Sequence, residues 1–320
     1  MNEVKLVYAT DDGYLTPTLV SVASALKCAS ERECVSIVVL DVGITPEKWE
    51  RFEGMLRVKY GPAFGLKRVA IDVGRYAGLK TYKGSVGTYA RLGIPQLFPE
   101  WDWCVYVDGD TLFMDDPLKL AEAYDARYAI QGQPDNENWT YIDGKPEKQI
   151  FAEARGLKWD SDQYVCAGFI TMNLKWFREN DATAKCMDYL RKYPDCGNHD
   201  QDALSSVCLG HIGKLPKQWG CLSRFAFLYG DPNCIHYAND APWKLMKSRR
   251  VDYNDAHKLW FDFAKRELGL SFRKLLTEPF SAANFARRYL ARLIFKTIFP
   301  FFALAGFPTP IGRYLRKHYR

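Results

Sequence analysis

Two aspartates separated by one glycine, Asp108-Gly109-Asp110, directly follow the apolar run Val105–Val107. Residues two apart in an extended chain point to the same side, so both carboxylates can converge on one point just beyond a strand. Carboxylates held that close repel each other, and a divalent cation relieves the repulsion. Oxygen ligands suit Mg²⁺ or Mn²⁺, and an added imidazole would favour Mn²⁺. The pattern therefore predicts a metal site at this point of the chain.

A cation held by these carboxylates would have a specific chemical task. It could bridge the two phosphates of a nucleotide diphosphate and neutralise the charge that develops as this group leaves. A leaving group handled in this way needs no dedicated general acid. Gly109 has no side chain, which would let the backbone approach a bulky ligand closely. The alternative interpretation of the Asp-Gly-Asp segment is a solvated turn after a strand.

The elements that must position these carboxylates alternate between strand and helix. Apolar runs and helical periodicity predict strands at Val4–Ala9, Val35–Leu40, Val69–Val73, Trp103–Val107, Tyr128–Gln131, Val165–Leu174 and Cys234–Tyr237. Helices are predicted to begin at Thr16-Pro17 and at Thr45-Pro46, and to cover Ser85–Ile94, Lys175–Tyr193 and His199–Cys208. This alternation favours an α/β fold, a mostly parallel sheet flanked by helices. Ligands of such sheets bind outside the carboxyl ends of the strands, and a second acidic pair, Asp11-Asp12, follows the first strand.

The overall composition excludes two function classes. With 48% hydrophobic and 26% charged residues, the chain has the composition of a globular protein and not of a disordered one. The net charge is +6, but residues 271–320 carry ten Lys and Arg against one acidic residue, Glu278. Without that +9 the remainder has a charge of −3, so the bulk of the protein lacks the general basic surface that nucleic-acid binding needs.

The cysteines and the first residues indicate a reducing compartment. The nine cysteines include no Cys-x-x-Cys pair, and the N-terminal residues lack the apolar segment of a signal peptide. We therefore expect a cytoplasmic protein whose thiols are free.

Five ordered motifs resemble glycosyltransferase family 8, the retaining family of bacterial lipopolysaccharide galactosyl- and glucosyltransferases. They cover roughly residues 4 to 245: Tyr8-Ala9-Thr10-Asp11-Asp12-Gly13-Tyr14; Thr88-Tyr89-Ala90-Arg91-Leu92 with Val105-Tyr106-Val107-Asp108-Gly109-Asp110; Ala167-Gly168-Phe169-Ile170-Thr171-Met172-Asn173-Leu174; His199-Asp200-Gln201-Asp202; and His236-Tyr237 with Pro242-Trp243. The resemblance implies a GT-A type nucleotide-diphospho-sugar transferase fold, a UDP-sugar donor, Mn²⁺ (with Mg²⁺ as the alternative) and retention at the anomeric carbon.

The resemblance also implies roles for individual residues. Asp108, Asp110 and His236 would hold the metal. Asp200 and Gln201 would act at the anomeric carbon of the donor, either around a covalent intermediate or in front-face attack. The donor, UDP-galactose or UDP-glucose, would be bound by Ala9, Thr10, Asp11, Gly13, Tyr14, Arg91, Asp108, Gly109, Ala167, Gly168, Asn239, Trp243 and Lys244. The acceptor would be a glycan or glycolipid such as a lipopolysaccharide or capsule precursor.

Three positions depart from the family pattern. Cys166 stands where the family has an Asn before Ala-Gly, and Gly13 replaces the usual Asn of the first turn. Ala241 replaces the Lys before Pro-Trp, and Lys244 lies just after that pair as a candidate substitute. These changes bear on the choice of sugar more than on the class of reaction.

The chain is expected to divide into a GT-A catalytic domain over residues 1–250 and a helical, basic-aromatic tail over residues 251–320. The apolar stretch of the tail is interrupted by Arg292, Lys296 and Pro300, so it suits an interfacial helix and not a spanning one. The tail would hold the protein on an anionic membrane surface, peripherally on the inner face of the cell membrane. Two rival functions remain at this point: a metal-dependent nucleotidyltransferase and a non-catalytic, membrane-surface carbohydrate-binding protein.

Overall fold

Two compact units make up the described part of the chain. The computed structural model describes residues 3–81, 85–135, 141–142, 145–146, 149, 153, 163–227, 230–244, 255–290 and 293. The first unit runs to Leu222 and includes Ala226–Ala238, and the second holds Ser223–Phe225 and the residues from Asn239 onward. The boundary expected after residue 250 lies outside the described residues.

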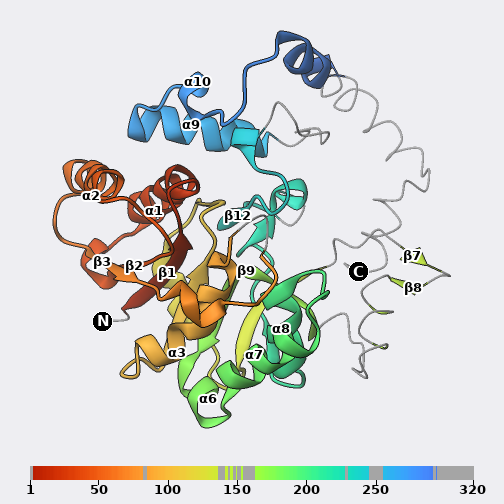
Figure 1. Cartoon of the computed structure of the whole chain (residues 1–320). Helices are drawn as coiled ribbons and strands as arrows, with labels where there is room; N and C mark the ends of the chain where they lie inside the picture. Colours follow the sequence, from red (N-terminus) through yellow and green to blue (C-terminus); the bar gives the residue numbers. More distant parts are fainter. Residues whose placement is uncertain are drawn as a thin grey trace. The chain divides into compact units, whose positions relative to one another are not determined.

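A seven-stranded sheet in the order β10-β6-β9-β4-β1-β2-β3 forms the centre of the first unit (Figure 1). Its strands are β1 (Val4–Thr10), β2 (Val35–Asp41), β3 (Gly65–Ala70), β4 (Trp103–Val107), β6 (Ile130–Pro134), β9 (Val165–Asn173) and β10 (Ile212–Lys214). Only β9 runs antiparallel to its two neighbours, and the other neighbouring pairs are parallel. The structure thus confirms the predicted α/β fold with a mostly parallel sheet.

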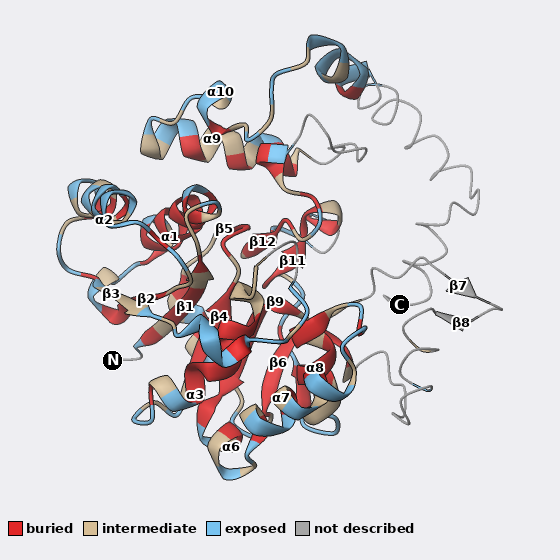
Figure 2. Cartoon of the chain, viewed as in Figure 1, coloured by how far each residue is buried: buried red, intermediate tan, exposed pale blue. Residues whose placement is uncertain are grey.

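Successive side chains of each strand point to opposite faces of this sheet. Different helices cover the two faces. On one face, Val7 and Tyr106 belong to a buried cluster with apolar residues of four helices: α3 (Ile94–Leu97), α6 (Leu174–Glu179), α7 (Ala182–Lys192) and α8 (His199–Val207). On the other face, Tyr8 meets Ser21 of α1 (Leu15–Cys28), and α2 (Pro46–Tyr60) packs beside α1. The strands between these layers are largely buried (Figure 2).

A small second sheet continues from the end of β4. It has the order β11-β12-β5, with β5 at Thr111–Phe113, β11 at Cys221–Leu222 and β12 at Cys234–His236. β12 runs antiparallel to β5 and pairs His236 with Thr111. The backbone N–H of Tyr237 also donates to the carbonyl of Asp110 at 2.8 Å. This pairing brings His236 to the segment between β4 and β5, where Asp108 and Asp110 lie.

Several predicted element bounds were wrong. The strand expected at Val69–Val73 is β3, at Gly65–Ala70, an edge strand whose polar residues hide it from a search for apolar runs. The strand expected at Tyr128–Gln131 begins later, at Ile130. The helix expected over Lys175–Tyr193 is broken into α6 and α7 at Asp181, whose φ is +51°.

Two predicted helix beginnings also differ from the structure. α1 begins at Leu15, before the predicted beginning at Thr16-Pro17. The Asp11 carboxylate accepts the N–H groups of Gly13 and Tyr14 just before this helix. The segment expected as a helix over Ser85–Ile94 is mainly a 3₁₀ helix at Gly87–Gly93, which leads into α3. Pro95 in α3 lacks a backbone donor, which suits the first turn of a helix.

The second unit is helical in its described part. It contains a 3₁₀ turn at Pro242–Lys244, α9 (Ala256–Leu268) and α10 (Phe272–Leu275), and residues 282–290 are helical as well. Trp243 and Trp260 pack together with their ring centroids 5.1 Å apart. Within the described residues, no helix combines the length and the apolar character that crossing a bilayer requires. The tail beyond residue 293, including the basic residues Arg313–Arg320, lies outside the described residues.

Candidate active site

Three potential metal ligands converge just beyond the carboxyl end of β4. Asp108 and Asp110 come from the connection to β5, and His236 comes from β12. The Nε2 atom of His236 lies 3.2 Å from Asp110 Oδ1 and 3.8 Å from Asp108 Oδ2. One ligating atom from each residue lies within 4.8 Å of the other two. The structure therefore brings together the three residues predicted to hold the metal.

The donor atoms of this cluster fit a divalent cation. His236 Nε2 and Asp110 Oδ1 are buried, and neither has a hydrogen-bond partner of good geometry among the described residues. Buried polar atoms are nearly always paired, so two such atoms facing each other indicate an expected ligand. Gly168 keeps the space open, because a Cβ atom there would lie 2.3 Å from His236 Cε1 and 2.5 Å from Asp108 Oδ2. One imidazole and two carboxylates are a donor set that a divalent cation can use.

Each carboxylate of the pair also has its own cationic neighbour. Arg91 Nη2 donates to Asp108 Oδ1 at 3.0 Å, and His236 lies against Asp110. Burial favours the neutral form of Asp110, but His236 and the Tyr14 hydroxyl outweigh it and lower the pKa of this carboxyl group. Burial likewise disfavours the charged imidazole of His236, but Cys166 and Asp110 raise its pKa well above the ordinary value. The repulsion expected between the aspartates is thus already offset within the protein.

Arg91 links the three potential metal ligands, Asp108, Asp110 and His236, to the predicted catalytic aspartate, Asp200. This guanidinium is buried, with 4% of the residue exposed, and forms ion pairs with Asp108 and, through Nε at 3.1 Å, with Asp200 Oδ2. Nη1 donates to the carbonyl of Ala167 at 2.5 Å, and the group lies 4.0 Å from the centroid of the Tyr106 ring. Arg91 therefore fixes the distance between the two acidic centres.

Asp200 lies at the beginning of α8 and is almost fully buried, with 5% of the residue exposed. Its carboxylate also accepts a hydrogen bond from the Thr88 hydroxyl. Burial raises the pKa of Asp200 to about 6, although Arg91 and Thr88 both favour the ionised form. Asp200 in turn favours the charged form of Arg91, so the two side chains attract each other. The pKa of Asp200 is raised nevertheless, because the loss of hydration on burial outweighs this attraction.

We expect the raised pKa of Asp200 to appear in the pH dependence of stability. A carboxyl group whose pKa is higher in the folded than in the unfolded protein stabilises the fold below pH 4, and this contribution is lost as pH rises to 6. A pKa raised from the ordinary 3.8 to about 6 corresponds to roughly 3 kcal/mol. Replacing Asp200 by Asn removes this dependence, so the free energy of unfolding of the variant should rise relative to wild type between pH 4 and 7.

Urea titrations at several pH values would measure that difference. The exposed Asp188, replaced by Asn, serves as the control and should follow wild type across the range. A difference between Asp200→Asn and wild type that does not change with pH would contradict the assignment.

Gln201, the second predicted catalytic residue, is held at both ends of its amide. Its Oε1 atom accepts the backbone N–H of Ala167 at 3.0 Å, and its Nε2 atom donates to Asp135 Oδ2 at 2.7 Å. The amide oxygen of Gln201, a residue expected to act at the anomeric carbon, thus already accepts one hydrogen bond. Its second lone pair is the one that remains for a ligand.

The residues of the first turn lie at the carboxyl end of β1. Asp11 Oδ1 accepts the backbone N–H groups of Gly13 and Tyr14, at 2.9 and 3.0 Å, which shapes the turn. The Tyr14 hydroxyl donates to Asp110 Oδ2 at 3.2 Å, so this residue, expected to bind the donor, also contacts one of the three potential metal ligands. Ala9 and Thr10 end the strand itself.

Gly109 has a structural neighbour that sequence reasoning did not anticipate. A Cβ atom there would lie 2.3 Å from Thr18 Oγ1 and 3.3 Å from Thr18 Cα. The absence of a side chain therefore lets the Asp108–Asp110 segment pack directly against α1.

The remaining donor-site residues predicted from the sequence, Asn239, Trp243 and Lys244, belong to the second unit. Asn239 is exposed and adopts a left-handed backbone conformation, with φ of +57°. Trp243 is buried against Trp260, and Lys244 is exposed.

Sequence reasoning missed three side chains around the cluster. The Tyr106 hydroxyl donates to Asp108 Oδ1 at 2.9 Å, Thr88 bonds Asp200, and Cys166 lies beside His236. The contact of Tyr106 could have been found from the sequence, since a residue two before Asp108 in a strand points to the same side. The other two contacts depend on the packing of distant segments.

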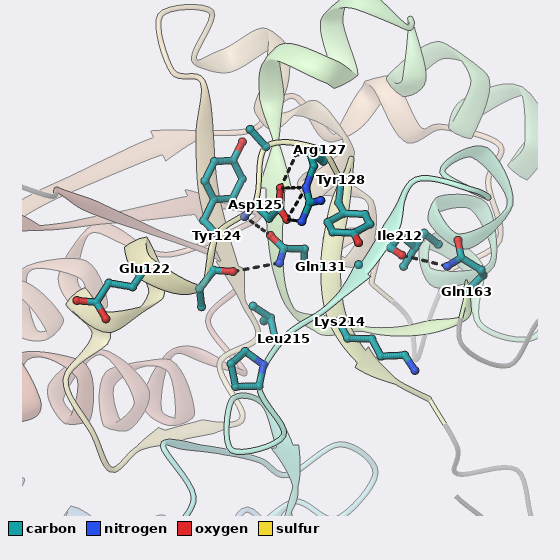
Figure 3. Close-up of a pocket in the computed structure, with 14 residues that line it drawn as sticks. Glu122, Tyr124, Asp125, Arg127, Tyr128, Gln131, Gln163, Ile212, Lys214 and Leu215 are labelled. Carbon is teal, nitrogen blue, oxygen red and sulfur yellow. Dashed lines mark hydrogen bonds and ion pairs between the residues drawn. The ribbon is translucent and has the colours of Figure 1, made fainter. Parts of the chain in front are cut away.

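An open depression of about 1010 Å³ lies at the β6–β10 end of the sheet (Figure 3). None of the predicted site residues lines it. The polar group at its base, the amide of Gln131, is engaged by the N–H of Asp125 at 2.7 Å and by the carbonyl of Ala123 at 3.1 Å. The depression is thus separate from the cluster at β4.

Two curated relatives share part of the sequence. A putative glycosyltransferase of Haemophilus influenzae is 24% identical over 210 residues, which are 65% of this chain and 60% of the relative. General stress protein A of Bacillus subtilis is 23% identical over 219 residues, which are 67% of this chain and 72% of the relative. The match therefore spans less than two thirds of the Haemophilus protein.

Solved glycosyltransferase structures of the GT-A type share the fold. A crystal structure of the galactosyltransferase LgtC, in complex with donor and acceptor sugar analogs, superposes with a TM-score of 0.69 at 20% identity and covers 85% of this chain and all of LgtC. The apo structure of the bifunctional glycosyltransferase WbbM gives a TM-score of 0.63 at 22% identity, over 90% of this chain and 52% of WbbM. The predicted GT-A type fold is confirmed.

The sequence profile of glycosyl transferase family 8 matches residues 5–247. This match begins in β1, includes the Asp-Gly-Asp segment and the Ala-Gly strand, and extends past His236. The chain therefore belongs to glycosyltransferase family 8.

Proposed function

We propose that the protein is a retaining glycosyltransferase that moves galactose or glucose from a UDP-sugar to a glycan or glycolipid acceptor. The observation that carries the proposal is the convergence of Asp108, Asp110 and His236 on one point, beside an Arg91–Asp200 pair. The first set of groups would serve the diphosphate leaving group, and the Arg91–Asp200 pair beside it would serve the donor sugar. Membership of family 8 supports the same reaction.

One set of residues would act on the diphosphate of the donor, and another set would act on its sugar. Asp108, Asp110 and His236 would hold Mn²⁺, which when bound supplies positive charge to the departing diphosphate. Arg91 would keep Asp200 ionised and oriented, so that Asp200 can bind hydroxyls of the donor sugar or face its cationic transition state. Gln201, fixed by Ala167 and Asp135, would present its amide oxygen to the anomeric carbon.

The donor is tested by measuring UDP release across a panel of UDP-sugars. We expect release from UDP-galactose or UDP-glucose in the presence of Mn²⁺ and none in the presence of EDTA. Pyrophosphate release from a nucleoside triphosphate would instead favour a nucleotidyltransferase. Sugar binding without turnover of any donor would favour a carbohydrate-binding protein, and either result would refute the proposal.

The stereochemical outcome is tested separately on the product. Retention predicts that an α-linked donor gives an α-linked product, whose anomeric proton has a small coupling constant in ¹H NMR. A β-linked product would refute retention while leaving the donor assignment intact. Asp200→Ala and Gln201→Ala should lower kcat much more than they weaken UDP binding, because both residues are assigned to the sugar.

For the tail we propose docking on an anionic membrane surface at the inner face of the cell membrane. In the described part of the tail, large apolar side chains are exposed at Phe280, Phe285, Tyr289, Leu290 and Leu293, with fractions of 44–59%. Arg287 lies on the same helix as Phe285, Tyr289 and Leu290, and the Arg273 guanidinium lies 5.9 Å from the centroid of the Phe280 ring. Basic and apolar side chains together suit a lipid interface. The full chain should sediment with vesicles containing anionic lipid, and truncation after residue 270 should release it while UDP-sugar hydrolysis continues. Sedimentation of the truncated protein would contradict this docking.

A further inference from the structure

Cys166 lies on the side of the His236 ring that faces away from the two carboxylates. Its Sγ atom is 3.6 Å from His236 Nδ1, within hydrogen-bond distance for sulfur, whereas His236 Nε2 faces Asp108 and Asp110. His236 is buried, with 1% of the residue exposed, so water does not readily replace this contact. Each ring nitrogen of His236 therefore contacts a different neighbour: Nδ1 contacts Cys166, and Nε2 contacts the two carboxylates.

Metal binding by Nε2 determines which way the contact with Cys166 must run. A nitrogen that ligates a metal uses its lone pair, so the ring proton has to reside on Nδ1. Nδ1 then donates, and the sulfur of Cys166 accepts. The opposite arrangement, with the thiol donating to Nδ1, would put the ring proton on Nε2 and block metal binding.

The strand that carries Cys166 is itself fixed by the rest of the site. The next residue, Ala167, donates its N–H to Gln201 and accepts from Arg91, and the carbonyl of Gly168 accepts the N–H of Asp108 at 2.7 Å. This segment of β9 cannot shift without disturbing each of those groups. The sulfur is therefore held at a constant position against the imidazole.

We propose that Cys166 is a positioning residue for the metal ligand His236, accepting the Nδ1 proton so that Nε2 is presented to the cation. The proposal rests on the metal site assigned above, and it gives a role to the position at which this chain departs from the Asn of the family pattern. Groups that orient a metal-ligating histidine in this way contribute to metal affinity without touching the metal.

The test is a Mn²⁺ titration of the full-length protein, followed by the EPR signal of free Mn²⁺ and carried out without any nucleotide. Replacing Cys166 by Ala should weaken Mn²⁺ binding by about 10- to 100-fold, the loss typical of such an orienting partner. Cys166→Ser retains an acceptor and should weaken it less. The matched control is Cys28→Ala, because Cys28 is also half-buried and makes a weak sulfur contact, 3.7 Å to the carbonyl of Phe113, outside the site.

Thermal unfolding of the metal-free proteins separates positioning from a role in folding. If Cys166 mattered only for packing, Cys166→Ala would lower Tm and bind Mn²⁺ as wild type does, and that result would overturn the proposal. Equal losses of affinity in Cys166→Ala and Cys28→Ala would overturn it too, as would a wild-type protein that binds no Mn²⁺. The Mn²⁺ titration uses no sugar donor, so it does not depend on hexose transfer. A protein that transfers no hexose would fail the UDP-release assay, and the result for Cys166 would still stand.

Discussion

Replacing Asp110 by Asn should reduce hexose transfer by roughly 10³-fold, since a loss of several kcal/mol of charge stabilisation at the leaving group corresponds to that factor. Asn removes one negative charge from a cluster of three potential ligands, so the cluster should attract a divalent cation less strongly. Mn²⁺ binding should weaken in parallel. The rate of UDP release at saturating Mn²⁺ and the Mn²⁺ titration together measure the two effects.

The matched control is Asp115→Asn. This carboxylate lies on the same stretch of chain but pairs with Lys119 at 2.8 Å, away from the cluster. Its replacement should leave transfer unchanged. Full activity in Asp110→Asn, or wild-type activity that survives EDTA, would show that the cluster does not serve catalysis.

Arg91→Met should give the largest loss of stability among single replacements at the site, about 3–5 kcal/mol, the loss typical when one partner of a buried ion pair is removed. Met retains much of the apolar stem but none of the five donors, so Asp200 and the carbonyl of Ala167 both lose a buried partner. Protonation of Asp200 should recover part of the loss at acidic pH. The free energy of unfolding from urea titrations at pH 7 and pH 5 measures both effects.

The control for this prediction is Arg127→Met, which removes an exposed arginine paired with Asp125 at the surface. Exposed ion pairs contribute little to stability, so this variant should unfold as wild type does. Adding Asp200→Asn to Arg91→Met should restore stability, because the stranded charge is then absent. A small loss in Arg91→Met that is the same at both pH values would refute the assigned role.

The sequence predicted the central strands more accurately than the peripheral elements. β4 was predicted with its observed bounds, and β9 to within one residue, because both are buried and read as continuous apolar runs. β3 is an edge strand, and its position depends on pairing with β2 rather than on its own residues. The break between α6 and α7 depends on a left-handed residue, Asp181, which gives a weaker signal in the sequence than a glycine would.

The candidate site was predictable where one segment of chain carries its residues. Asp108 and Asp110 could be placed on one side of a strand end from their spacing alone, and His236 was assigned through the family motifs. The double pairing of Arg91 and the contact of Cys166 could not be predicted. The pairing of Arg91 depends on how the 3₁₀ helix at Gly87–Gly93 packs beside Asp108 and the beginning of α8. The contact of Cys166 depends on β9 running antiparallel beside β4, which places the amino end of β9 at the carboxyl end of β4. No local pattern encodes that reversal.

The pairing of β12 with β5 has a consequence for the order in which the protein matures. During synthesis the strands β1 to β9 leave the ribosome before His236 is made, so the sheet can assemble while the proposed metal site still lacks its imidazole. Contacts between segments distant in sequence form late, since the loop between them must first be closed. Affinity for Mn²⁺ should consequently appear only after β12 has been made and has paired with Thr111–Phe113. Cation binding would then report when a nascent chain has completed the folding of the first unit.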